Sequence, residues 1–157
     1  MALPTLVLTG ASGFVGRHLL EAIAEDYRIF GIGRRSQQRC GAPVHPNITW
    51  FQVDIGEREP LGEVFRMIKV LGGAETVVHL AAHYDFTGDE HPEYQRTNVD
   101  GLRNTLDFSR ELGVKRFVFS SSVAACRLPA PGSALTESSP PDGDHIYART
   151  KRIGAAL

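Results

Sequence analysis

With 157 residues, 17 basic and 18 acidic side chains and a formal charge of −1, the chain has the size of one globular domain. Its basic residues are scattered, so we expect no nucleic-acid partner. Only two cysteines, Cys40 and Cys126, are present, which argues against a disulfide framework and favours a reducing, cytoplasmic location. No stretch approaches the roughly 20 apolar residues of a membrane span, and the N-terminus lacks an export signal, so we expect no membrane partner.

Short apolar runs that suit buried strands alternate along the chain with apolar residues at helical spacing. We predict strands at residues 6–8, 28–33, 48–53, 76–80 and 117–119. We predict helices at residues 14–26, 61–71 and 92–112, and loops around residues 41–46 and 128–143. This alternation is typical of a doubly wound parallel α/β sheet with at least five strands and helices on both faces, and we expect one domain over residues 1–157.

The doubly wound arrangement also predicts where a ligand binds. Ligands of such sheets lie outside the carboxyl ends of the strands, at the point where the strand order reverses, which we expect between the first and fourth strands. The residues that follow the five predicted strands should face this site; they come after Leu8, Gly33, Val53, Leu80 and Ser120.

A glycine-rich turn, Thr9 to Gly16, lies between the first strand and the first helix. Gly10 permits a tight turn, Gly13 lets a pyrophosphate approach the backbone, and Gly16 lets the helix pack closely on the strand. The G-x-x-G-x-x-G spacing departs by one residue from the familiar G-x-G-x-x-G, and a structural turn is the alternative. Its place between a strand and a helix favours a nucleotide site.

Arg34 follows the second strand, where an acidic residue would accept a bond from a ribose 2′-hydroxyl. With Arg35 and the hydroxyl of Ser12, Arg34 offers donors to a 2′-phosphate instead. We therefore predict NADP, preferred over NAD, with solvated loop arginines as the alternative. Asp54 and Ile55, after the third strand, are predicted to meet the adenine, although Asp54 alternatively caps the turn.

A phenol and an ammonium, from Tyr147 and Lys151, share one face if their segment is helical. The ammonium is expected to lower the pKa of the phenol and so prepare it for proton transfer, although one such pair is weak evidence. The serine run Ser120 to Ser122 follows the fifth strand, where hydroxyls would face the same site, with turn formation as the alternative.

Together these motifs resemble the extended branch of the short-chain dehydrogenase/reductase superfamily, which has a Rossmann fold. The resemblance spans the chain and rests on Thr9 to Gly16 (T-G-x-x-G-x-x-G), Asp54-Ile55, His79-Leu80-Ala81-Ala82, Asn98-Val99-Asp100-Gly101 (N-V-x-G), Ser120 to Ser122, and Tyr147 with Lys151 (Y-x-x-x-K). Six ordered motifs are far more specific than any one of them.

The resemblance implies a role for each matching residue. Tyr147 is the general acid/base, Lys151 lowers its pKa and holds the nicotinamide ribose, and Ser122, with Ser121 as the fallback, orients the substrate oxygen. The implied cofactor-binding residues are Gly10, Ser12, Gly13, Phe14, Val15, Gly16, Arg34, Arg35, Asp54, Ile55, Leu80, Ala81, Ala82, Asn98, Ser120, Tyr147 and Lys151. No metal site is expected, because His79 and His83 are four residues apart but straddle a strand end and a loop, so they do not share a helical face.

The segment after the serines separates the reactions of this branch. Val123 to Arg127 lacks the V-Y-G typical of nucleotide-sugar epimerases and dehydratases, which favours a reductase or dehydrogenase acting on a small carbonyl or alcohol. An epimerase or dehydratase acting on a nucleotide sugar stays open, as does a non-catalytic NADP(H) sensor.

The resemblance also bears on the extent and assembly of the protein. Extended members continue past the Y-x-x-x-K helix into a substrate-binding region, so we expect residues 1–157 to be the N-terminal part of a longer enzyme, with a natural short chain that binds the cofactor without turning over substrate as the alternative. The helices that hold Asn98 and Tyr147 commonly form a homodimer in the family. His83 and Tyr84, in the loop after the fourth strand, are candidates for substrate contact.

Overall fold

The computed structural model describes residues 2–157, and its centre is a five-stranded parallel sheet. The strands are β1 (Thr5–Thr9), β2 (Arg28–Gly33), β3 (Ile48–Gln52), β4 (Thr76–His79) and β5 (Arg116–Phe119). They pair in the order β3-β2-β1-β4-β5, so the order reverses between β1 and β4. The doubly wound parallel sheet predicted from the sequence is confirmed.

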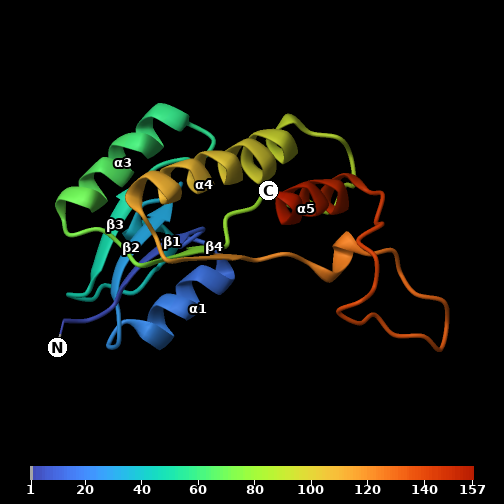
Figure 1. Cartoon of the computed structure of the whole chain (residues 1–157), viewed down its shortest axis with the longest axis horizontal. Helices are drawn as coiled ribbons and strands as arrows, with labels where there is room; N and C mark the ends of the chain where they lie inside the picture. The colour runs from blue at the N-terminus through green and yellow to red at the C-terminus, as the bar shows by residue number, and fades with distance from the viewer. Residues whose placement is uncertain (1) are drawn as a thin grey trace.

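Helices cover both faces of this sheet (Figure 1). Helix α1 (Phe14–Ile23) lies on one face, while α3 (Arg58–Val70) and α4 (Gly101–Leu112) lie on the other. A π-helical turn, η1 (Tyr94–Asp100), runs directly into α4, and α5 (Ile146–Ala156) packs against η1. Two short helices complete the set, α2 (Gln37–Cys40) and the single 3₁₀ turn η2 (Val123–Ala125).

Alternation along the strands divides the core into two apolar clusters. In β1, Val7 joins the cluster on the α3 side, whereas Leu6 and Leu8 join the cluster on the α1 side. Because successive side chains of a strand point to opposite faces, one short run of apolar residues can anchor both layers. Leu20 of α1 and Leu61 of α3 are fully buried members of the two clusters.

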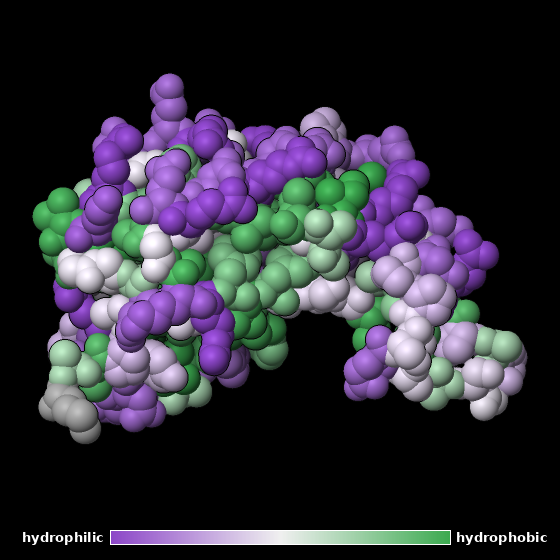
Figure 2. Space-filling model, viewed as in Figure 1, coloured by the Kyte–Doolittle hydropathy of each residue, from purple (hydrophilic) through white to green (hydrophobic). Residues whose placement is uncertain are grey.

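Two local elements differ from the prediction. The short helix α2, which was not predicted, comes directly before the loop expected at residues 41–46: the Ser36 hydroxyl accepts a hydrogen bond from the Arg39 amide, and Gly41, at φ +66°, ends the helix. The chain is helical from Pro92, as expected, but the turn η1 that follows and leads into α4 is π-helical rather than α-helical. The long segment after η2 stands away from the sheet and leaves a hollow beneath α5 (Figure 2).

Within residues 2–157, none of the helices combines the length and the apolar character that a membrane crossing requires.

Candidate functional site

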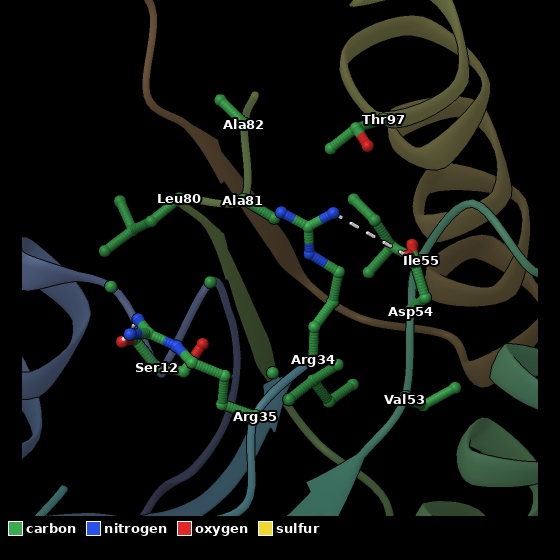
Figure 3. Close-up of a pocket in the computed structure, with 14 residues that line it drawn as sticks. Ser12, Arg34, Arg35, Val53, Asp54, Ile55, Leu80, Ala81, Ala82 and Thr97 are labelled. Carbon is green, nitrogen blue, oxygen red and sulfur yellow. Dashed lines mark hydrogen bonds and ion pairs between the residues drawn. The ribbon is translucent and has the colours of Figure 1, made fainter. Parts of the chain in front are cut away.

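A cavity of about 400 Å³ opens at the carboxyl edge of the sheet, where the strand order reverses. This is the place at which open α/β sheets bind their ligands. It is lined by the end of β2, by the segments that follow β1, β2, β3 and β4, and by one residue of η1 (Figure 3): Gly10, Ser12, Gly13, Ile32, Gly33, Arg34, Arg35, Val53, Asp54, Ile55, Leu80, Ala81, Ala82 and Thr97. The sequence prediction of the ligand edge therefore coincides with a real cavity.

The glycine-rich turn forms one wall of the cavity and requires glycine for steric reasons. Gly10 has φ +72°, and a Cβ there would lie 2.6 Å from the backbone nitrogen of Ala81. A Cβ at Gly16 would collide with the carbonyl oxygen of Gly10. The turn thus brings the bare backbone to the start of α1, whose free amides suit a pyrophosphate, and the cradle fits a dinucleotide.

Apolar side chains form the opposite wall. Val53 and Ile55 line it, across the cavity from Leu80, and an apolar surface of this kind suits an adenine ring. The carboxylate of Asp54 has other partners: it accepts a hydrogen bond from the Gly56 amide at 2.9 Å and pairs with Arg96 at 3.1 Å. Asp54 therefore caps its turn, which is the alternative that the sequence left open.

The two arginines after β2 diverge from each other (Figure 3). The Arg35 guanidinium donates to the carbonyl oxygen of Ser12 on the glycine turn. The Arg34 guanidinium instead crosses the cavity and lies 3.2 Å from Glu93 and 4.0 Å from Asp54. Both guanidinium groups lie at the cavity, but in this structure they do not converge on one point.

Lys151 is buried beside the end of β5, with 3% of its surface exposed. Its Nζ donates to the Ser120 carbonyl oxygen at 2.8 Å and lies 4.9 Å from the centre of the Phe119 ring. Within residues 2–157 no carboxylate lies at ion-pair distance from it, and burial lowers its pKa to about 8. A buried, unpaired lysine is costly, and such residues mark functional sites.

Tyr147 lies next to this lysine, with the Lys151 Nζ 5.6 Å from the centre of its ring. We expected the ammonium to lower the pKa of Tyr147, and this expectation is wrong in this structure. Burial raises the pKa, and a hydrogen bond with Ser122 offsets only part of the rise. The ammonium points to the Ser120 carbonyl oxygen, so it has no resolved effect on the phenol.

Asn98 occupies a different place from the one expected of a cofactor-binding residue. Its Oδ1 accepts from the His83 amide at 2.6 Å, and its Nδ2 donates to the His83 carbonyl oxygen and the Thr150 hydroxyl, both at 3.0 Å. All its polar atoms are thus engaged in joining the loop after β4 to α5. Phe14 and Val15 are 72% and 60% exposed and do not line the cavity either.

Sequence reasoning missed several residues at the cavity. Ile32, Gly33, Val53 and Thr97 line it, and Glu93, just before η1, contacts Arg34. The strand residues could have been found by extending the rule that strand ends face the ligand. Glu93 carried no such signal, because it lies 59 residues from Arg34 in the chain.

The family model for the NAD dependent epimerase/dehydratase family matches residues 6–157. The chain belongs to this family. The membership confirms the resemblance to extended short-chain dehydrogenases/reductases and agrees with the cavity at the glycine turn.

Individual relatives cover several chemistries of the family. The chain is 32% identical to a putative dihydroflavonol 4-reductase of Synechocystis sp. over 83% of this chain and 36% of the relative. It is also 32% identical to an N-acetyl-alpha-D-glucosaminyl-diphospho-ditrans,octacis-undecaprenol 4-epimerase of Escherichia coli O157:H7, over 93% of this chain and 40% of the relative. The chain thus spans well under half the length of these relatives.

Solved structures of two enzymes superpose closely on this chain. The Bordetella bronchiseptica enzyme WbmG in complex with NAD matches with a TM-score of 0.84 at 24% identity, over 99% of this chain and 49% of that one. Uronate dehydrogenase from Agrobacterium tumefaciens matches with a TM-score of 0.81 at 24% identity, over all of this chain and 55% of that one. At these identities the likeness establishes the fold.

Proposed function

We propose that the chain is the NADP(H)-binding part of a reductase or dehydrogenase, with Tyr147 as its acid/base. The observation that carries the proposal is the buried, unpaired Lys151 beside Tyr147, at the sheet edge that also holds the glycine-turn cavity. A turn that merely closed the fold would need no buried ammonium there. The same pair argues against a non-catalytic nucleotide sensor.

The residues around the reacting centre have distinct tasks. NADP(H), when bound, supplies the hydride donor or acceptor. The Tyr147 hydroxyl gives a proton to the substrate oxygen, or takes one from it, while Ser122 holds that oxygen in place. Lys151 is anchored through the Ser120 carbonyl oxygen and keeps a positive charge beside the phenol, where a cofactor ribose comes within its reach.

Arg34 and Arg35 support the preference for NADP over NAD. Guanidinium groups match a phosphate in geometry and charge, and both side chains lie at the cavity after β2, where a ribose 2′-position is held in this fold. Neither residue can accept a hydrogen bond from a free 2′-hydroxyl. The arrangement therefore favours the phosphorylated cofactor.

A fluorescence titration with NADPH and with NADH tests the cofactor assignment. We expect NADPH to bind more tightly and the preference to fall by about tenfold in Arg34→Ala or Arg35→Ala, because each variant loses a charge-assisted contact. Arg103→Ala is the matched control, since Arg103 and Arg34 both have 54% exposed side chains but Arg103 lies on α4. Equal affinity for the two nucleotides in the unaltered protein contradicts the assignment.

Tyr147→Phe tests the catalytic assignment. We expect the variant to lose turnover with a panel of aldehydes and ketones while its NADPH affinity stays unchanged, because only the proton-transferring hydroxyl is removed. Tyr27→Phe, in the turn before β2, is the control for loss of a tyrosine hydroxyl. A Tyr147→Phe rate equal to that of the unaltered protein refutes the role.

Epimerases of the family are the second candidate, favoured by the Escherichia coli relative that matches 93% of this chain. An epimerase returns the hydride to its substrate within one turnover, whereas a reductase or dehydrogenase releases the changed cofactor. Tracing a deuterium label from the cofactor distinguishes them: we expect it to appear in the released product without recovery in the cofactor.

A further inference from the structure

Glu93 precedes the π-helical turn η1 and pairs with Arg34, whose side chain crosses the cavity. We propose that Glu93 determines how strongly the site discriminates NADP(H) from NAD(H), because it competes with the 2′-phosphate for Arg34. The inference rests on the proposed nucleotide site and adds a residue that works against the preference rather than for it.

Arg34 already has an anionic partner in this structure. Its Nη1 donates to Glu93 Oε2 at 3.2 Å and lies 4.0 Å from Asp54 Oδ2. More than half of the Arg34 side chain is exposed, so a second anion can reach it. An arginine paired in this way offers less of its charge to a phosphate than a free one does.

Glu93 is the fixed partner of the pair. Its carboxylate accepts from the Thr97 hydroxyl and from the Arg96 guanidinium, both at 3.0 Å, and 24% of its side chain is exposed. Although partial burial disfavours its charge, these two contacts and Arg34 lower the pKa of Glu93. The carboxylate is therefore charged at neutral pH and held in position, and Arg34 is the partner that moves.

The directions of the two arginines give the competition its geometry. Arg35 faces the Ser12 carbonyl oxygen, while Arg34 points away from it toward Asp54 (Figure 3) and also pairs with Glu93. One phosphate can engage both guanidinium groups only if Arg34 leaves Glu93. NADP(H) binding thus includes the loss of this ion pair, whereas NAD(H), which lacks the phosphate, does not need it broken.

The local charge adds to this effect. Three carboxylates, Asp54, Glu57 and Glu93, surround two guanidinium groups, Arg34 and Arg96. The cluster therefore carries an excess negative charge, which opposes a phosphate near Arg34. Removing the Glu93 charge changes both the local potential and the direct pairing, and a control is needed to separate the two.

Glu93→Gln is the test, because glutamine keeps the shape and still accepts from Thr97. We expect NADPH to bind about three- to fivefold more tightly and NADH to change by less than about twofold, as befits one exposed ion pair. Glu57→Gln is the matched control, because it removes a charge from the same cluster. Glu57 pairs with Arg96 at 2.5 Å and is not a partner of Arg34. A gain confined to Glu93→Gln supports direct competition.

A double-mutant cycle completes the experiment. The gain from Glu93→Gln should vanish in the Arg34→Ala background, because the competition acts through Arg34. A gain that persists there, an equal gain for NADH, an equal gain from Glu57→Gln, or weaker NADPH binding by Glu93→Gln overturns the inference.

The same titrations separate this inference from the proposed function. If the unaltered protein shows no preference but Glu93→Gln prefers NADPH, the proposed preference is refuted while the role of Glu93 is supported. If no variant binds either nucleotide, both are refuted.

Discussion

Replacing Lys151 with methionine should stabilise the folded chain at neutral pH. Burial lowers the pKa of Lys151 from 10.5 to about 8. Because one pKa unit corresponds to about 1.4 kcal/mol, the buried ammonium costs the folded state about 3 kcal/mol at pH 7. Methionine preserves much of the stem and carries no charge. The variant also loses the hydrogen bond to the Ser120 carbonyl oxygen, which reduces the expected gain in stability by about 1 kcal/mol.

The pH dependence of this difference is the sharper test. The cost is fully present below the folded pKa of about 8 and disappears as the pH rises to the unfolded value of 10.5, since in that window only the folded chain has lost its proton. The stability advantage of Lys151→Met should therefore shrink by about 2 to 3 kcal/mol between about pH 7 and about pH 10.5.

Urea denaturation of the unaltered protein and the variant at several pH values measures this change. Lys115→Met is the control, because 76% of the Lys115 side chain is exposed and its loss should give no comparable trend. If the difference in the free energy of unfolding between Lys151→Met and the unaltered protein stays constant across the pH range, the buried ammonium does not destabilise the fold. That result would remove the physical argument for its functional role.

Two further predictions concern the fold around the site. His79 is fully buried, and its pKa is lowered to about 3, mainly by burial and then by the charge of Lys151. The free energy of unfolding should therefore fall as the pH drops from 6.5 toward 3, and in His79→Gln this loss should be smaller by roughly 3 to 5 kcal/mol. An unchanged dependence of stability on acid pH in the variant would contradict the burial argument. Gly10→Ala should lower the free energy of unfolding by more than about 2 kcal/mol, because it adds a clash with Ala81 to the strain of positive φ. Gly113→Ala, at φ +78° with open space around it, should lower it by only about 1 kcal/mol. Thermal unfolding compares the two variants, and equal losses of stability would refute the clash.

Much of the fold was predictable because its signals are local. The run Leu6-Val7-Leu8 is too short for a helix and too apolar for an exposed loop, and it became the central strand β1. The glycine turn was equally readable, since its backbone conformation requires residues without a Cβ. The π-helical turn η1 was not, because its geometry depends on packing against α5 rather than on its own composition.

The candidate site also has features that local sequence signals predict and features that depend on distant residues. The spacing of Tyr147 and Lys151 predicts that they are neighbours, and they are. The spacing could not show that the ammonium turns to the Ser120 carbonyl oxygen or that burial raises the phenol pKa, because both depend on residues far away in the chain. The pairing of Arg34 with Glu93 was invisible for the same reason.

An assigned amide nitrogen–proton correlation spectrum, recorded during titration with NADPH, tests the central claim most directly. The account predicts saturable shifts at Gly10, Ser12, Gly13 and Gly33, which line the cavity at the reversal of strand order. A spectrum unchanged at saturating NADPH, or one whose shifts gather around Met67 at the apolar groove between β3 and α3, would contradict it.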